Sequence, residues 1–304
     1  MASQARLLTV GEAFDDLIFV GLARLPAPGE ELRTDRFAAT FGGGAVITAI
    51  GAARLGVSAS IASGLSERAH RRLRIERVQV HNLRRAEEPT AVSVALSTSS
   101  DRAFVTFEGI NAALEPRFAR AVAASRASHV HLAFYPRDCD RWARLATRLR
   151  RRGVTVSADF GWNDRLAGEP ALPRLIDVLD VLLLNELEAP LYARTATFDE
   201  ALVYWRRRAS AVIIKRGAGE TLWLTRQGDV RARPPRARPV DTTGAGDAFN
   251  AGFLWAWLRG APPPVCLAAG NFVGARSTRQ PGGLDALPYH DDVPQAIRSG
   301  AQGA

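Results

Sequence analysis

The sequence predicts a three-layer αβα fold: helices cover both faces of a central, mostly parallel β-sheet, and a small β lid is attached. Short apolar runs alternate with helix-like segments, which is typical of parallel strands joined by crossover helices. Gly56 and Gly153 follow two of the expected helices, as helix stop signals do. The expected strands cover residues 7–10, 92–96, 130–134, 154–158, 181–184, 212–214 and 221–224. The expected helices cover residues 44–55, 138–152 and 199–208.

Two segments break this alternation. Residues 12–37 contain the turn sequence Pro26-Ala27-Pro28-Gly29, and residues 90–108 read as two strands around a hairpin turn at 97–101. The chain has 304 residues, of which 47% are apolar, and this fits one large packed domain with a small appendage. We therefore expect a single domain over residues 1–304, with a lid formed by residues 12–37 and 90–108.

The chain is strongly basic, with a formal net charge of +9. Lys215 is its only lysine, so 39 of its 40 basic residues are arginines. Clustered arginines can form a nucleic-acid surface, but they equally suit solvated helix faces, and no nucleic-acid-binding motif accompanies them. Nucleic acid is therefore not an expected partner. A positive field also attracts an anionic nucleotide.

The cysteines and the apolar runs bear on the cellular compartment. Cys139 and Cys266 lie far apart and form no disulfide framework, which fits a reducing cytoplasm. Residues 1–10 lack the long apolar stretch of a signal peptide, and no run approaches the length of a membrane span. We expect a cytoplasmic protein that does not bind membranes.

Polar residues follow three of the expected strands. Asp159 follows strand 154–158, Asn185 follows strand 181–184, and Lys215 follows strand 212–214. In parallel sheets, ligands bind beyond the carboxyl ends of the strands. The sequence therefore predicts a ligand site at this edge of the sheet.

The strongest functional signal is Asp241-Thr242-Thr243-Gly244-Ala245-Gly246-Asp247. An apolar stretch, 248–258, follows it and reads as a buried helix. A glycine-rich turn that opens a helix directs several N–H groups and the positive helix end at one point, which suits a phosphate. Asp247, beside that point, can accept a hydroxyl proton during phosphoryl transfer. Helix capping is the alternative role for the two aspartates, but the complete run before a buried helix favours catalysis.

This run, extended by Ala248-Phe249, resembles the C-terminal signature of the ribokinase-like (PfkB) carbohydrate kinases. The resemblance covers most of the chain and rests on further motifs. In the N-terminal half these are the first strand with a substrate-binding aspartate (11–16, where the spacing selects Asp16), a lid turn (26–30) and the di-glycine Gly42-Gly43. Next come an Asp-x-Asn-x-Arg-like segment with two extra residues (159–165), the Asn-x-x-Glu motif (Asn185 to Glu188) and a nucleotide loop (215–219). The last is a loop near the adenine and a monovalent-cation site (277–283).

The resemblance implies an ATP-dependent kinase that phosphorylates a hydroxyl of a sugar, sugar acid or nucleoside. Asp247 would be the general base, and the amides of Gly244, Ala245 and Gly246 would form an anion hole. Glu188 would hold Mg²⁺ through water, and Asp241 is a candidate for a monovalent cation such as K⁺. Nucleotide contacts are expected from Asn185, Lys215, Gly217, Gly219, Thr243 and Asn271. Substrate contacts are expected from Asp16, Gly42, Gly43, Asn163 and Arg165. The resemblance also makes a homodimer that forms through the lid an expected assembly.

The chain departs from the family pattern in its substrate half. Ile47 stands where the N-terminal signature has an asparagine that hydrogen-bonds substrate hydroxyls, and the loss of one polar partner in a closed site shifts specificity. The expected Gly-x-Asp-x-x-Gly block is replaced by Gly64-Leu65-Ser66-Glu67-Arg68 and an arginine-rich run. These departures keep a second hypothesis open, a nucleotide-binding regulatory protein with weak catalysis on the same fold. The retained Asp247 favours the kinase.

Overall fold

The computed structural model describes residues 5–98, 102–208, 211–226 and 228–301. The strands of its large sheet are β1 (Arg6–Gly11), β4 (Ser58–Ser63), β5 (Gln79–Asn82), β8 (His129–Ala133), β9 (Thr155–Ala158), β10 (Val181–Asn185), β11 (Ala211–Lys215), β12 (Thr221–Thr225) and β13 (Gly228–Ala232). Within the described residues, these nine strands follow the order β13-β12-β11-β10-β9-β8-β1-β4-β5. Neighbouring strands from β5 to β11 are parallel, whereas β12 and β13 each pair antiparallel with the strand before them.

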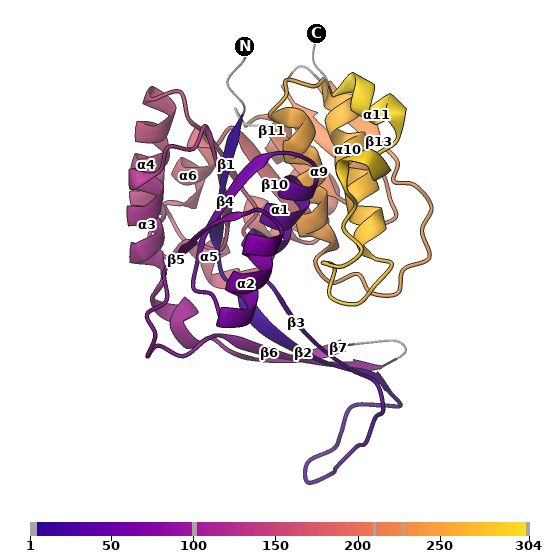
Figure 1. Ribbon diagram of the computed structural model, residues 1–304. Helices are drawn as coiled ribbons and strands as arrows, with labels where there is room; N and C mark the ends of the chain where they lie inside the picture. The colour runs from indigo at the N-terminus through magenta and orange to yellow at the C-terminus, as the bar shows by residue number, and fades with distance from the viewer. Residues whose placement is uncertain (1–4, 99–101, 209–210, 227, 302–304) are drawn as a thin grey trace.

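Helices cover both faces of the large sheet (Figure 1). One face packs against α1 (Gly44–Arg54), α2 (Glu67–Ile75), α9 (Ala245–Trp257), α10 (Pro263–Ser277) and α11 (Gln295–Gly300). The other packs against α3 (Glu115–Ala124), α4 (Cys139–Arg151), α5 (Asp164–Gly168), α6 (Leu172–Val178), α7 (Glu188–Ala193) and α8 (Phe198–Arg206). The strands are apolar on both sides for this reason: Leu182 and Leu184 enter one core, and Val181 and Leu183 enter the other. The described residues also form the short 3₁₀ turns η1 (Gly109–Ala113) and η2 (His290–Asp292).

Local sequence signals fix several helix starts. Asp138 caps α4, because its carboxylate accepts a hydrogen bond from the Arg141 amide at 2.9 Å. Thr197 and Glu200 form a capping box at the start of α8. Such caps satisfy N–H groups that have no partner within the helix.

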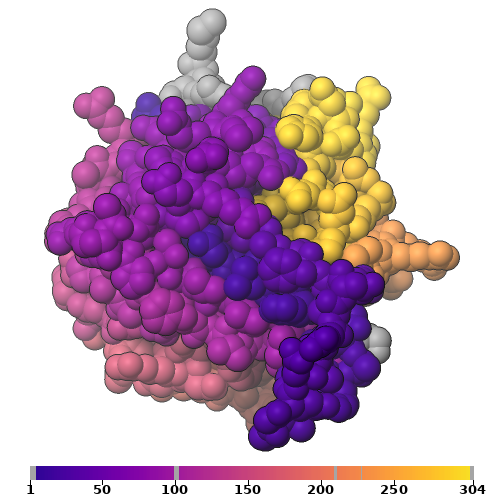
Figure 2. Space-filling model, turned by 60° about the horizontal axis from the view of Figure 1, so that its bottom comes forward, coloured from indigo at the N-terminus to yellow at the C-terminus, as the bar shows by residue number. Residues whose placement is uncertain are grey.

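A second, smaller sheet lies beside the carboxyl ends of the parallel strands. We call it the small sheet; it consists of β2 (Phe14–Leu22), β3 (Phe37–Gly42), β6 (Val92–Thr98) and β7 (Arg102–Phe107), in the order β3-β2-β6-β7. Figure 1 shows it at the bottom of the molecule, where β1 leads into it. Figure 2 brings this face forward and shows the indigo N-terminal part of the sheet lying across it. The small sheet therefore stands at the edge where ligands of parallel sheets bind.

The predicted three-layer fold is confirmed. Residues 92–96, expected as a buried strand, belong to β6 of the small sheet and are mostly half-buried. The small sheet draws on both expected lid segments and also on residues 38–42 of β3. Residues 99–101 of the expected hairpin turn lie outside the described residues. The sequence reading placed neither β4 nor β5, which are short and contain few large apolar residues. In the described part of the chain, no helix is both long and apolar enough to cross a bilayer.

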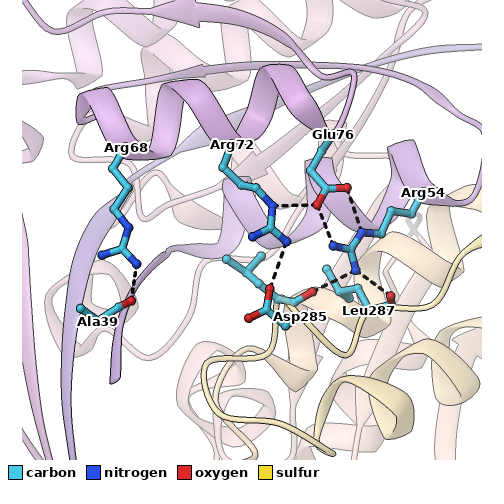
Figure 3. A network of polar contacts seen from close by, with 8 residues as sticks. Ala39, Arg54, Arg68, Arg72, Glu76, Asp285 and Leu287 are labelled. Atoms are coloured by element: carbon cyan, nitrogen blue, oxygen red, sulfur yellow. Dashed lines mark hydrogen bonds and ion pairs between the residues drawn. The ribbon is translucent and has the colours of Figure 1, made fainter. Parts of the chain in front are cut away.

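Helix α2 occupies the region where the expected glycine block is replaced by arginines, and it is not simply a solvated face (Figure 3). Arg68 donates a hydrogen bond to the carbonyl of Ala39 in the small sheet. Arg72 pairs with Glu76 at 2.9 Å and with Asp285 at 3.0 Å. The helix thus ties the small sheet to the C-terminal loop around residue 285.

A buried ion pair strengthens the same connection. Arg54 of α1 pairs with Glu76 at 2.7 Å, and both side chains are almost fully buried. The Arg54 guanidinium also donates to the carbonyls of Leu284 and Leu287, at 3.2 and 2.8 Å. Burial opposes ionisation of Glu76, but hydrogen bonds from Arg54 and Arg72 outweigh it and keep the pKa of Glu76 below its usual value. The loop after α10 is therefore anchored by charge-assisted hydrogen bonds.

Candidate active site

The turn before α9 gathers backbone groups at one point. Gly244 has φ 71°, a left-handed conformation that suits glycine, and α9 begins at the next residue. The amides of Gly246 and Asp247 lie in the first helical turn, where N–H groups have no partner within the helix. The Ala245 amide donates to the carbonyl of Thr242 at 3.2 Å, so this one of the three expected anion-hole amides already has a partner.

Asp241 holds this turn together. One carboxylate oxygen accepts from the Thr243 amide at 2.8 Å, and the other accepts from the Gly282 amide at 2.8 Å. A Cβ atom on Gly283 would lie 2.6 Å from the Thr243 carbonyl, so the loop around residue 282 packs directly on the turn. Both oxygens of Asp241 are thereby committed to backbone amides, which shows a structural task beside the expected cation site.

Asp247 projects from the first turn of α9 toward the start of α1. A Cβ atom on Gly44 would lie 2.8 Å from its Oδ1, so the carboxylate rests against that glycine. The hydroxyl of Thr48 donates to the Asp247 carbonyl at 3.1 Å and links the two helices. Removal of water by the surrounding protein, together with the Asp159 carboxylate, raises the pKa of Asp247 to about 7, and the Lys215 ammonium opposes this rise. A carboxylate with that pKa is suited to accept a proton near neutral pH.

Three side chains from separate elements meet beside Asp247. Lys215 at the end of β11 places its Nζ 2.5 Å from Oδ2 of Asp159, which follows β9. Asn250 of α9 donates to the same Oδ2 at 2.7 Å, and its Oδ1 lies 3.4 Å from Lys215 Nζ. Burial acts to lower the pKa of Lys215, but Asp159, Glu188 and Asp247 outweigh it and raise that pKa above its usual value. The ammonium therefore stays charged among these carboxylates.

Asn185 and Glu188 form a closed pair at the end of β10. The Asn185 amide N–H donates to Glu188 Oε2 at 2.8 Å, and its side-chain Nδ2 donates to Oε1 at 2.6 Å. In return, Asn185 Oδ1 accepts from the Glu188 amide at 2.8 Å. Glu188 is 4% exposed, and burial together with Asp159 raises its pKa to about 7. This oxygen-rich pair fits a hydrated Mg²⁺ held through water, since Mg²⁺ prefers oxygen ligands and keeps several waters.

No dedicated protein cage for a metal is present among the described residues, because no three His, Cys, Asp or Glu side chains gather as metal ligands do. A magnesium ion bound by one or two carboxylates plus substrate phosphates needs no such cage. The donor set at Asn185 and Glu188 is therefore compatible with magnesium that enters with a nucleotide.

The small sheet brings a second carboxylate to the same glycine segment. A Cβ atom on Gly42 would lie 2.6 Å from Asp16 Oδ2, and one on Gly43 would lie 2.2 Å from the carbonyl of Glu12. Burial, with a smaller effect of Asp15, raises the pKa of Asp16 to about 7. Residues 42–44 thus have Asp16 at one end and Asp247 at the other.

Ile47, which replaces the expected asparagine, packs against the turn before α9. It is 3% exposed, and its Cδ1 would lie 2.4 Å from a Cβ atom on Gly244. The loop at Gly282 approaches Thr40 and Ile18 of the small sheet, with a Cβ at Gly282 lying 3.0 Å from Thr40 Cγ2. This side of the site therefore presents apolar atoms at the position where an asparagine was expected to contact the substrate.

Other expected site residues are engaged elsewhere. Asn163 caps α5 by accepting from the Leu166 amide at 2.8 Å, and Arg165 is exposed on that helix. Asn271 accepts from the Thr221 hydroxyl at 2.6 Å and donates to the Ala232 carbonyl at 3.2 Å, so it joins α10 to β12 and β13. These side-chain contacts are structural in the described part of the chain.

Two glycines expected at the nucleotide lie in the loop after β11. Gly217 has φ 54° and open space around its Cα, and the Gly219 amide donates to the Arg216 carbonyl at 2.7 Å. The loop is therefore a tight turn, and no other residue lies close to Gly217 on its open side.

The sequence reading did not include Asp159 or Asn250 among the site residues. Asp159 directly follows an expected strand, and this position at the sheet edge is its sequence signal. Asn250 lies three residues after Asp247, so both share one face of α9. The pairing of Asn250 with Asp159 depends on tertiary structure and has no local signal.

Comparison with known proteins agrees with this arrangement. Residues 4–289 match the model of the pfkB family carbohydrate kinases. The ribokinase of Mus musculus is 26% identical over 313 residues, covering 96% of this chain and 95% of that protein. The nucleoside kinase of Methanothermobacter thermautotrophicus is 26% identical, covering 90% and 89%. The solved adenosine kinase from Sinorhizobium meliloti shares the fold with a TM-score of 0.80 and 22% identity, covering 97% of this chain and 100% of its own. The chain therefore belongs to the pfkB family of carbohydrate kinases and is a phosphotransferase with an alcohol group as acceptor.

Proposed function

We propose that this protein transfers the γ-phosphoryl group of ATP to a hydroxyl of a sugar, sugar acid or nucleoside, with Asp247 as the general base. The observation that carries the proposal is the position of Asp247: its carboxylate lies in the first turn of α9, beside the helix amides and against Gly44. A proton acceptor and an anion-binding helix end thereby occupy one place.

The reaction follows from these positions. The substrate hydroxyl loses its proton to Asp247 as its oxygen bonds to the γ-phosphorus. The bond from that phosphorus to the β–γ bridging oxygen breaks, and ADP leaves. The amides at Gly244, Ala245 and Gly246 stabilise the negative charge that grows on the phosphoryl oxygens. Because Ala245 already donates to Thr242, its amide contributes only after that 3.2 Å bond is released or shared.

Nucleotide and cations fit the groups around this centre. Lys215, Gly217 and Gly219 lie at or after the end of β11 and are proposed nucleotide contacts, with Thr243 before α9. Glu188, oriented by Asn185, would hold Mg²⁺ through water. Bound there, the ion would neutralise phosphate charge. Asp241 is proposed to help order a monovalent cation such as K⁺, tested by comparing rates in potassium and tetramethylammonium salts.

The substrate is proposed to lie between the small sheet and α9. Asp16, Gly42 and Gly43 line the small-sheet side, and Ile47 supplies an apolar contact next to Gly244. A substrate with an apolar face toward Ile47 avoids leaving a hydroxyl without a partner, which costs about 1–3 kcal/mol in a closed site. Asn163 and Arg165 would reach such a substrate only after α5 moves, since Asn163 now caps that helix.

The small sheet is proposed to act as a lid and as the contact of a homodimer. Four of its apolar side chains are more than half exposed: Phe37, Phe104, Val105 and Phe107. They lie on β3 and β7, the two edge strands of the small sheet, and large apolar side chains left exposed favour association. Sedimentation of Phe104→Glu beside the parent chain tests this contact, and a monomeric parent chain contradicts it. A cytoplasmic location is part of the proposal and fits the buried free cysteines.

The decisive experiment is a screen for ADP release over sugars, sugar acids and nucleosides, with Asp247→Asn as control. We expect at least one compound to be turned over by the parent chain about 10³-fold faster than by the variant. ATP binding is measured in parallel by calorimetry. ATP binding without turnover above the Asp247→Asn level overturns the proposal and supports the regulatory protein with weak catalysis.

A further inference from the structure

Lys215 differs from every other basic residue in the chain. It is the only lysine among 40 lysines and arginines. A lysine ammonium is a compact point charge with three N–H donors, whereas a guanidinium is a wide planar fork. The composition favours arginine everywhere else, so the retained lysine indicates a position that needs a small cation.

The surroundings of Lys215 explain this need. Its ammonium is enclosed by Asp159 at 2.5 Å and Asn250 at 3.4 Å, and the Lys215 and Asp159 side chains are only 12% and 9% exposed. Asn250 Nδ2 also donates to Asp159 Oδ2 at 2.7 Å, which closes a triangle of polar contacts. A Cβ atom on Gly246 would lie 3.2 Å from Lys215 Nζ, so the ammonium lies directly beneath the residue before Asp247. A planar guanidinium is larger than an ammonium and would need more room between these groups.

The carboxylates around this ammonium all favour its charged form. The carboxylates of Asp159, Glu188 and Asp247 all act on it. His131 on β8 also faces this group, but it is fully buried and its pKa is lowered to about 4, chiefly by burial, so it is neutral at pH 7. Among these groups, Lys215 is the positive charge that can keep a second carboxylate ionised beside Asp159.

We propose that Lys215 is a positioning residue for the general base: Asp159 and Asn250 fix its ammonium beside Gly246, and from there the ammonium favours the ionised form of the Asp247 carboxylate, which accepts the proton. This inference rests on the proposed function and changes the part assigned to Lys215. A residue that only contacts nucleotide would act on ATP binding, whereas a residue that acts through Asp247 alters the protonation of the base.

The single lysine makes a direct test available. Protein labelled with ¹⁵N-lysine gives one side-chain ammonium signal, whose titration reports Lys215 without assignment by mutation. If Lys215 and Asp247 interact, Asp247→Asn shifts this signal and lowers the pKa of Lys215, because coupling between two groups is reciprocal. Asp229→Asn, which removes a carboxylate that pairs with Arg206 at 2.6 Å and is not among the groups acting on Lys215, leaves the signal unchanged. An Asp247→Asn spectrum that matches the parent overturns the inference, whether or not a substrate has been found.

Kinetics give the second readout. Lys215→Met keeps the unbranched side chain up to the position of Cε and removes the charged group. We expect kcat at pH 7 to fall about 10- to 100-fold, with KM for ATP changed less than threefold. The acid limb of the pH profile moves up by about one unit, because an opposite charge at this range favours ionisation. Lys215→Met/Asp159→Asn, which also removes the carboxylate that pairs directly with the ammonium, replaces the single variant if that variant does not fold. A raised KM for ATP with an unmoved pH profile shows a nucleotide contact only and contradicts the inference.

Discussion

The carboxylate of Asp247 rests against Gly44, where a Cβ atom would approach Oδ1 to 2.8 Å. No side chain of any size fits at position 44 without moving the proposed base. We therefore expect Gly44→Ala to lower kcat about 100-fold, since a displacement of about 1 Å at the reacting centre has effects of this order. Thermal unfolding should change little, because alanine favours the helix that begins at this residue. Steady-state kinetics and calorimetry measure the two effects.

Gly168→Ala is the matched control for this change. Gly168 lies in α5 and has open space around its Cα, so an added methyl group meets nothing within 4 Å. Its kinetics should equal those of the parent chain. Full activity in Gly44→Ala would show that Asp247 need not occupy its present position, and would remove the main support for its role as the base.

Asp247 itself should lower stability at neutral pH. Its pKa is about 7 in the folded chain against 3.8 for a free carboxyl. A raised folded pKa means that the contribution to stability is full below pH 4 and is lost as the pH rises to 7. Asp247→Asn has no carboxyl that can lose stability in this way. Its free energy of unfolding should therefore equal that of the parent chain at pH 4 and exceed it by about 1–2 kcal/mol at pH 8, a value reduced for partial solvent access. Tm would then rise by about 2–4 °C at pH 8.

The comparison variant for this pH series is Asp199→Asn, which removes an exposed carboxylate at the start of α8. Its effect on Tm should not grow between pH 4 and pH 8. If Asp247→Asn gives an equally flat series, the carboxyl of Asp247 titrates normally, and desolvation is not what prepares it as a base.

The buried Glu76 carboxylate should stabilise the chain in the opposite pH range. Arg54 and Arg72 hold its pKa below the usual value, so its contribution is present above pH 4.5 and is lost as the pH falls through the folded pKa. Glu76→Gln should destabilise by about 3 kcal/mol at pH 7, because it leaves Arg54 buried without its counter-charge. Urea unfolding at pH 7 and pH 3.5 measures the effect, which should shrink at the lower pH. Glu31→Gln, which breaks an exposed pair with Arg33, should leave the midpoint of urea unfolding unchanged. If Glu76→Gln has an equally small effect, the network in Figure 3 does not anchor the loop.

The residues that could be predicted from sequence are those whose signal is local. Buried strands such as 181–184 are apolar on both faces, and the turn at Gly244 carries its own glycine and its own following helix. Helix α2 lacked such a signal, because an arginine-rich segment reads as solvated whether or not its charges find partners. Its anchors, at Ala39 and Asp285, lie 29 and 213 residues away from the arginines that bind them. The same holds for Asn250 and Asp159, which are separated by 91 residues.

Ile47 and Gly244 offer a test of how the substrate side supports the anion hole. A Cβ atom on Gly244 would lie 2.4 Å from Ile47 Cδ1, and φ 71° adds backbone strain for any other residue. Gly244→Ala should therefore lower kcat strongly. In that variant, the added change Ile47→Val, which removes only Cδ1, should raise kcat again by about 3- to 10-fold. This recovery corresponds to a coupling of about 1 kcal/mol in a double-mutant cycle. Gly260→Ala is the control, since φ 75° imposes similar strain with nothing within 4 Å, and Ile47→Val should add no rescue there. Equal effects of Ile47→Val in both backgrounds would mean that strain alone damages Gly244→Ala, and that Ile47 does not support the turn.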